Sequence, residues 1–131
     1  MTHSDIASYD ALVKTGAIGS LKRDVLLEGS RDFEYLAAIA SRLGKMSSAA
    51  KSDMIPNTVR LVEELIAAGF CRLASWGDDK RPKFLDHTGD EITSLVERSI
   101  RDEPFIFFLQ TTEAGDAWVA RYDKLISELS A

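Results

Sequence analysis

Few side chains in this sequence have the types needed for nucleophilic or acid–base catalysis. Cys71 is the sole cysteine, in a segment that alternates like a strand, where its neighbour Arg72 would point to the opposite face. We therefore expect a buried, inert thiol at this position. His87 follows Asp86, a pair that could transfer a proton or bind a metal, yet no further ligands stand at a diagnostic spacing. A loop histidine near the start of a helix is the simpler interpretation.

The sequence also lacks the frameworks on which cofactors are usually held. Gly16 and Gly19 are isolated and are not followed by the Lys-Ser/Thr pair of a phosphate-binding loop. No pair of carboxylates stands in a recognisable catalytic framework. We therefore predict no enzymatic activity, no metal site and no cofactor.

A second group of residues could contact DNA. Asn57 and Arg60 lie on a predicted helix and could reach base edges, while Lys80, Arg81 and Lys83 lie in and after a polar loop that could contact phosphates. The alternative interpretation is structural. Asn57 would cap the helix, and Arg60 would be a solvated arginine paired with the acidic residue one turn later.

The distribution of charge leaves both interpretations open. The chain has 16 Lys and Arg against 21 Asp and Glu, a formal net charge of −5. Segment 45–83 contains seven bases and five acids, so it carries +2 and the remainder carries −7. Such asymmetry is compatible with a weak DNA-binding protein. Glu63 and Glu64, on the same predicted helix as Arg60, would however repel phosphates.

The acidic remainder favours a protein partner instead. Asp90, Glu91, Glu97 and Asp102 lie in and beside one predicted helix and could form a surface that blocks a basic toxin or effector. Small immunity proteins and antitoxins often act through such surfaces. The alternative is a solvated acidic surface that keeps the protein in solution.

Aromatic side chains suggest further contacts. Trp76 ends a predicted strand before a polar loop, so it is either an exposed interface anchor or a cover for the sheet edge. Phe105, Phe107 and Phe108 place aromatic rings on both faces of one predicted strand, and both faces then need cover. This pattern predicts a homodimer, with the first and last helices as contact elements.

Hydrophobic periodicity predicts mostly helices, with strands confined to the second half. Helices are expected over about 5–14, 21–28, 31–43, 48–54, 57–68, 90–101 and 113–129, and strands over 70–76, 83–85 and 105–109. Ile92, Leu95, Val96 and Ile100 are expected to face inward from the helix over 90–101. Trp118, Tyr122, Leu125 and Leu129 form the apolar stripe of the last helix.

Residues typical of helix ends set these boundaries. The predicted helix stops are Gly29, Gly44 and Gly69, and Pro56 is expected to break the chain. The predicted caps are Ser30, Asn57, a capping box from Thr88 to Glu91, and Thr111 or Thr112 before the last helix.

Two passages resemble winged helix–turn–helix proteins. Residues 58–70 (TVRLVEELIAAGF) are similar to the recognition helix, glycine and first wing strand of that superfamily. Residues 109–118 (LQTTEAGDAW) are similar to the last wing strand and dimer helix of regulators of the multiple-antibiotic-resistance type. About thirty residues, including a whole helix, separate the two wing strands. The layout therefore looks more like small uncharacterised bacterial winged-helix-like proteins with a helix inserted in the wing.

These observations together predict one domain over residues 1–131, with a helical extension over 1–29 and a winged-helix core over 30–129. The expected class is α+β and mostly helical, with a small antiparallel sheet and a C-terminal helix. We expect a non-enzymatic protein-binding module, with a DNA-binding regulator as the alternative. No membrane-spanning run or signal peptide is recognisable, and the single cysteine fits a reducing compartment, so a cytoplasmic protein is expected.

Overall fold

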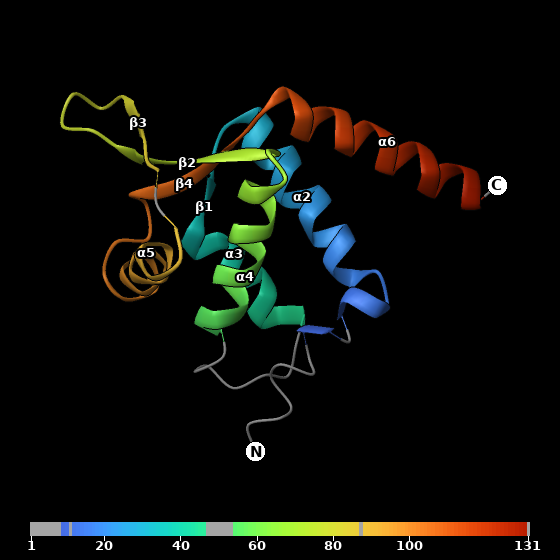
Figure 1. Cartoon of the computed structure of the whole chain (residues 1–131), viewed down its shortest axis with the longest axis horizontal. Helices are drawn as coiled ribbons and strands as arrows, with labels where there is room; N and C mark the ends of the chain where they lie inside the picture. The colour runs from blue at the N-terminus through green and yellow to red at the C-terminus, as the bar shows by residue number, and fades with distance from the viewer. Residues whose placement is uncertain (1–8, 11, 47–53, 87, 131) are drawn as a thin grey trace, which may run out of the picture.

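The fold is built on a four-stranded antiparallel sheet with helices packed against it (Figure 1). The computed structural model describes residues 9–10, 12–46, 54–86 and 88–130. In chain order the elements are α2 (Ala17–Arg31), β1 (Glu34–Tyr35), α3 (Leu36–Met46), α4 (Met54–Ala67), β2 (Cys71–Trp76), β3 (Pro82–Phe84), α5 (Asp90–Arg101), β4 (Phe107–Thr111) and α6 (Glu113–Ser130). Residues 9–10 and 12–14 are also helical. The predicted class, α+β and mostly helical with a small antiparallel sheet and a C-terminal helix, is confirmed.

The strands lie in the order β1-β4-β2-β3. β2 and β4 pair over five residues, from Cys71 opposite Thr111 to Ser75 opposite Phe107. β3 returns along β2 as the predicted short strand. β1, which pairs with β4, was not predicted, because two residues are too few to show an alternating pattern.

The two faces of the sheet are buried in different ways. Leu73 of β2 and Leu109 of β4 lie in the main hydrophobic core with residues of the helices. Ala74 and Phe108 are equally buried but lie outside that core, because successive residues of a strand point to opposite faces. The second face is covered by aromatic rings, since Phe33 and Trp76 both contact Phe108.

The predicted stop at Gly29 is wrong, because α2 continues to Arg31. Gly29 lies inside the helix where its backbone approaches β4, and a Cβ there would lie 2.6 Å from Thr111 Oγ1. Glycine is needed at this position for close packing, not for a left-handed turn. Ser30 therefore belongs to α2 and does not cap the next helix. Gly44 likewise lies inside α3.

The predicted start of α4 is also wrong. The helix begins at Met54, so Asn57 is its fourth residue and not its cap, and Pro56 does not break it. Proline is tolerated in the first turn because its missing N–H has no partner within the helix there. The predicted end is confirmed, since Gly69 has a φ of 78° directly after the helix. Most of the predicted helix over 48–54 and the first part of that over 5–14 lie outside the described residues.

α5 has the predicted bounds and buries Ile92, Leu95 and Val96 as expected. Ile100, however, is 40% exposed, and Ser99 is buried in its place. The hydroxyl of Ser99 donates a hydrogen bond to the Leu95 carbonyl at 2.7 Å, which satisfies it in the core. The predicted capping box forms in part. The Thr88 N–H donates to Glu91 Oε1 at 3.5 Å, but Gly89 is the cap residue and no side-chain oxygen caps the helix.

β4 lies two residues later than predicted, so Phe105 and Ile106 precede it in a turn and are exposed. The cap of α6 at Thr112 is confirmed, because its Oγ1 accepts the Gly115 N–H at 3.2 Å. Trp118 is half-buried and packs on Phe70, as the stripe predicted.

The second half of that stripe is not buried. Leu125 and Leu129 are 57% and 77% exposed. α6 extends beyond the helices that cover the sheet (Figure 1), so these side chains stay exposed within the part of the chain that the structure describes.

Glu34 of β1 is buried beside this core. Arg42 Nη2 lies 3.2 Å from Glu34 Oε2, an ion pair without hydrogen-bond geometry. Burial raises the pKa of Glu34 to about 7, and the nearby Glu28 and Asp24 add to this while Arg42 opposes it. The carboxyl is therefore partly protonated near neutral pH.

The close approach at Gly29 gives a stability prediction with a matched control in the same helix. Gly29→Ala should destabilise the fold by about 1–3 kcal/mol, because the new methyl group overlaps Thr111 and the Leu109 carbonyl. Gly19→Ala should stabilise it by about 0.5–1 kcal/mol, because a Cβ there meets Tyr122 at an ordinary 3.5 Å and alanine favours helix. Urea unfolding measures both, and equal effects of the two substitutions would contradict the packing argument.

The raised pKa of Glu34 gives a pH prediction. Between its ordinary pKa of 4.5 and about 7, the folded state keeps a proton that the unfolded state has lost. This group therefore lowers stability as pH rises through that interval, by about 3 kcal/mol in total. Glu34→Gln should remove this dependence and be more stable than the wild type above neutral pH. Urea unfolding at several pH values tests this, with Glu113→Gln, an exposed carboxylate that does not contribute to the raised pKa of Glu34, as the control that should change little.

Candidate functional site

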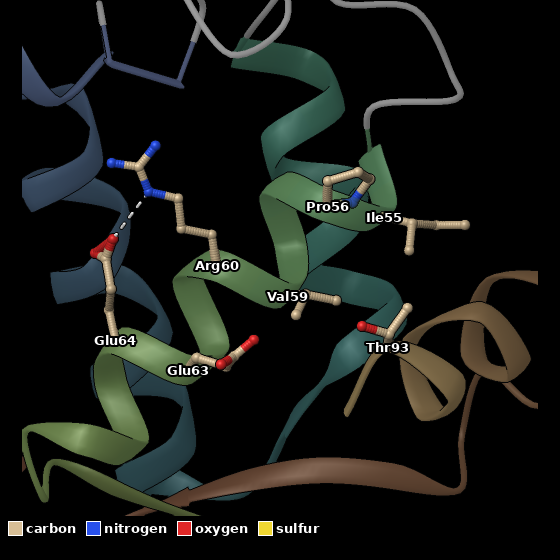
Figure 2. Close-up of a pocket in the computed structure, with 7 residues that line it drawn as sticks. All are labelled: Ile55, Pro56, Val59, Arg60, Glu63, Glu64 and Thr93. Carbon is tan, nitrogen blue, oxygen red and sulfur yellow. Dashed lines mark hydrogen bonds and ion pairs between the residues drawn. The ribbon is translucent and has the colours of Figure 1, made fainter. Parts of the chain in front are cut away.

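The exposed side of α4 lies between two other elements. The helical residues before α2 approach it on one flank, and α5 packs against it on the other (Figure 2). Arg60 and Glu64 leave α4 toward the first flank, whereas Val59 and Thr93 point toward each other between α4 and α5 (Figure 2). The two flanks therefore have different chemistry.

Arg60, a predicted base-reading residue, is held by its own chain. Its guanidinium forms ion pairs with Asp10 at 3.0 Å and Glu64 at 3.4 Å. It also lies over the Tyr9 ring, 4.1 Å from the ring centroid. These contacts use both the charge and the planar face through which an arginine would bind a base.

Glu64 links this flank together. Its carboxylate accepts a hydrogen bond from Lys22 Nζ at 2.9 Å and lies 3.2 Å from the Tyr9 hydroxyl, which donates to it. Burial raises the pKa of Tyr9 and the charge of Glu64 raises it further, so this phenol stays protonated and remains a donor. The network fixes the helical residues before α2 against α4.

A groove of about 550 Å³ runs along the exposed side of α4 toward α5, and Arg60, Glu63 and Glu64 line it together with apolar residues. Ile55, Pro56 and Val59 supply its apolar surface, and Thr93 faces them from α5 (Figure 2). A smaller hollow of about 180 Å³ shares Glu63 with this groove. The smaller hollow is lined by Glu63, Ile66, Ala67, Thr88 and Ile92. The two hollows therefore adjoin along α4 and α5, and Glu63 lies where they meet. We call the surface that they form together the α4–α5 seam.

Glu63 gives this seam its charge. Its side chain is exposed, and it forms no ion pair or hydrogen bond within the described part of the chain. A solvated carboxylate above an apolar surface can attract a cation while the apolar surface is covered. A ligand that matches the seam therefore carries both an apolar face and a positive charge.

The predicted phosphate-contacting bases lie elsewhere, in the hairpin of β2 and β3. Lys80, Arg81 and Lys83 are exposed and form no ion pair with other described residues. Figure 1 shows this hairpin extending away from the helices. Asn57 is half-buried on α4, so the structure does not bring it together with the hairpin bases into one cluster.

The predicted acidic interface residues are spread along α5. Asp90 and Glu91 are exposed in its first turn, next to the Thr88 end of the seam. Glu97 pairs with Arg101 at 3.5 Å. Asp102 follows the helix, roughly 18 Å from Asp90 at 1.5 Å per residue. Only the first two of these four acids therefore adjoin the seam.

Trp76 is part of an aromatic cluster and is only half exposed. Its Nε1–H donates to the Tyr35 hydroxyl at 3.2 Å, and its ring meets Phe33 and Phe108 at centroid distances of 4.9 Å. These contacts account for its position on the second face of the sheet, which the aromatic rings cover. Phe105, 68% exposed, packs edge-on against Tyr35 at the border of the same cluster.

Of the two reactive side chains that the sequence singled out, the structure describes only Cys71. Cys71 is buried in the core, and burial raises its thiol pKa to about 12, so the expected inert thiol is confirmed. His87 lies outside the described residues. Within those residues, no cluster of three or more His, Cys, Asp or Glu side chains could hold a metal ion. No helix in the described part is long and apolar enough to span a membrane.

The sequence did not reveal the distant residues that contact Arg60 and its partner Glu64. Tyr9, Asp10 and Lys22 lie 38 or more positions before Arg60, and no local spacing links them to α4. Thr93, which faces Val59 across the groove, was equally hidden. Only its position on the side of α5 away from Leu95 could have suggested a polar contact surface.

Comparisons of this chain with protein-family models, with curated proteins and with solved structures found no match. The chemistry of the site therefore rests on its own geometry.

Proposed function

We propose that this chain is a non-enzymatic protein-binding module that holds a basic, amphipathic segment of a partner protein along the α4–α5 seam. The observation that carries the proposal is Glu63, a carboxylate that lies where two hollows meet and pairs with none of the described residues. The sharpest form of the proposal is an immunity-like or antitoxin-like inhibitor that covers a basic surface of a toxin or effector.

Charge supports a cationic partner. Arg60 is the one base on α4, and its charge is balanced by Asp10 and Glu64, so it offsets little of the charge of Glu63. Asp90 adds an exposed carboxylate at the far end of the seam. The chain as a whole has a formal net charge of −5, which would also raise the association rate with a basic partner.

Shape supports an amphipathic partner segment. The seam offers Ile55 and Pro56 at one end and Ile66 with Ala67 at the other. An apolar helix face can cover such a surface and leave its flanking lysines near the carboxylates. A wholly polar chain would gain charge contacts there but no apolar burial.

A DNA-binding regulator remains the second candidate, because Lys80, Arg81 and Lys83 are exposed and unpaired among the described residues. The order of helices and strands is also compatible with the winged-helix resemblance. The pairing of Arg60 with Asp10 and the exposed Glu63 disfavour α4 as a base-reading helix. In this alternative the hairpin makes most of the contacts.

The protein-binding proposal is tested with a fluorescent model helix that has leucines on one face and lysines on the other. Anisotropy titrations should give binding that weakens with salt, because charge pairs at the rim are screened. Glu63→Lys should weaken binding at least about tenfold, which corresponds to about 1.4 kcal/mol. Thr93→Trp, which fills the groove without changing charge, should weaken it as well.

The matched control is Asp78→Lys, which makes the same change in net charge at the exposed tip of the hairpin. It should leave peptide affinity nearly unchanged. If Asp78→Lys and Glu63→Lys weaken binding equally, the peptide responds only to net charge and the seam is not the site.

The alternative is tested by titrating a DNA duplex at low salt. If the protein binds DNA through the hairpin, replacing Lys80, Arg81 and Lys83 together with alanine removes up to three phosphate contacts. The slope of log affinity against log salt concentration should then decrease in magnitude by up to about 2.7, or about 0.9 per lost contact. Arg60→Ala should have little effect, because that side chain is already paired. Failure of the wild type to bind the duplex at low salt would exclude the regulator.

A further inference from the structure

The last two turns of α6 carry an apolar surface that the described part of the chain does not cover. Leu125, Ile126 and Leu129 are 57%, 45% and 77% exposed. The same helix is well packed in its first half, where Val119 is buried and Trp118 stacks on Tyr122. Figure 1 shows the C-terminal half running out past the other helices.

The exposed residues continue the stripe that packs into the fold. Trp118, Tyr122, Leu125 and Leu129 are spaced by four, three and four residues, the pattern of a two-helix seam. A stripe that is covered for half its length and bare for the rest is typical of a helix that pairs with another helix.

The flank of this stripe carries both signs of charge. Arg121, Lys124 and Glu128 are exposed beside Leu125, with which they line a hollow of about 300 Å³. None of the three forms an ion pair with another described residue. Asp123, on another side of the helix, is held by Arg23 of α2 at 3.0 Å. The free charges thus lie beside the bare stripe, while the charge next to α2 is already paired.

We propose that the C-terminal half of α6 binds the same segment of a second copy of this chain, with the two helices antiparallel. Residues 121 and 128 are equally far from the point between Lys124 and Leu125. A two-fold axis at that point therefore sets Arg121 of each copy opposite Glu128 of the other and brings the two Leu125 side chains together at the centre. The surface is complementary to itself in charge as well as in apolar character.

This surface lies on the last helix, one of the two contact elements that the sequence predicted for a homodimer, but a different feature points to it. The aromatic strand that prompted that expectation is covered in part by its own chain, since Phe108 is fully buried under Phe33, Tyr35 and Trp76. The proposal of a second copy therefore rests on the exposed apolar residues of α6, Leu125, Ile126 and Leu129.

Sedimentation velocity of the full chain from about 1 µM to about 200 µM tests the proposal, because mass action separates a dimer from a monomer over such a range. The wild type should move from monomer to dimer. Leu125→Glu with Leu129→Glu should remain monomeric throughout, and its circular dichroism and unfolding midpoint should stay native because both side chains are exposed. A monomeric wild type at the highest concentration, or a dimer that survives both substitutions, would overturn the proposal.

A charge exchange tests the antiparallel register. Glu128→Arg alone places two arginines against each other at both ends and should weaken the dimer about tenfold. Arg121→Glu combined with Glu128→Arg restores opposite charges only if residues 121 and 128 face each other, so the double variant should recover the wild-type dissociation constant. A double variant as weak as the single one would overturn the antiparallel arrangement. Both variants keep Glu63 and the α4–α5 seam intact, so the outcome is independent of peptide binding there.

Discussion

The pairing of β2 with β4 is the constraint on which the rest of this fold depends. Five residue pairs, from Cys71 with Thr111 to Ser75 with Phe107, join segments more than thirty residues apart. Everything between them must leave the sheet and return to it. The chain does so as a hairpin followed by α5, and α5 can bury Ile92, Leu95 and Val96 only by packing against α3 and α4. The α4–α5 seam is thus a consequence of strand pairing.

The same pairing fixes the direction of α6. The Thr112 hydroxyl donates to the Gly69 carbonyl at 2.6 Å and its N–H donates to the Phe70 carbonyl at 3.0 Å, so the end of β4 is tied to the end of α4. Gly115 then lies directly against the Phe70 carbonyl, where a larger residue has no room. A helix that starts under these restraints runs away from the sheet. The apolar side chains in its last turns therefore lie outside the core and are exposed.

Electrostatics decides what the resulting surfaces can bind. On one flank of α4, Lys22 and Arg60 meet Asp10 and Glu64, so four charges balance one another within the chain. On the other flank Glu63 stays solvated beside apolar side chains. One helix therefore presents a neutralised side and an acidic, apolar side. This division favours a protein partner at the seam over a nucleic acid at the whole face of α4, and it leaves the hairpin as the basic part of the surface.

The sequence by itself determined the features that depend on neighbouring residues. The bounds of α5, the glycine stop after α4, the strand at Cys71–Trp76 and the Thr112 cap could be predicted because each is set by spacing and turn chemistry within about ten residues. Tertiary structure decided the rest. Gly29 could not be recognised as a packing position without β4 beside it, and the bare end of α6 could not be separated from its buried start, because both halves have the same period. The pairing of Arg60 with Asp10 joins residues fifty positions apart, so whether that arginine was free to bind DNA became clear only once the folded chain brought the two charges together.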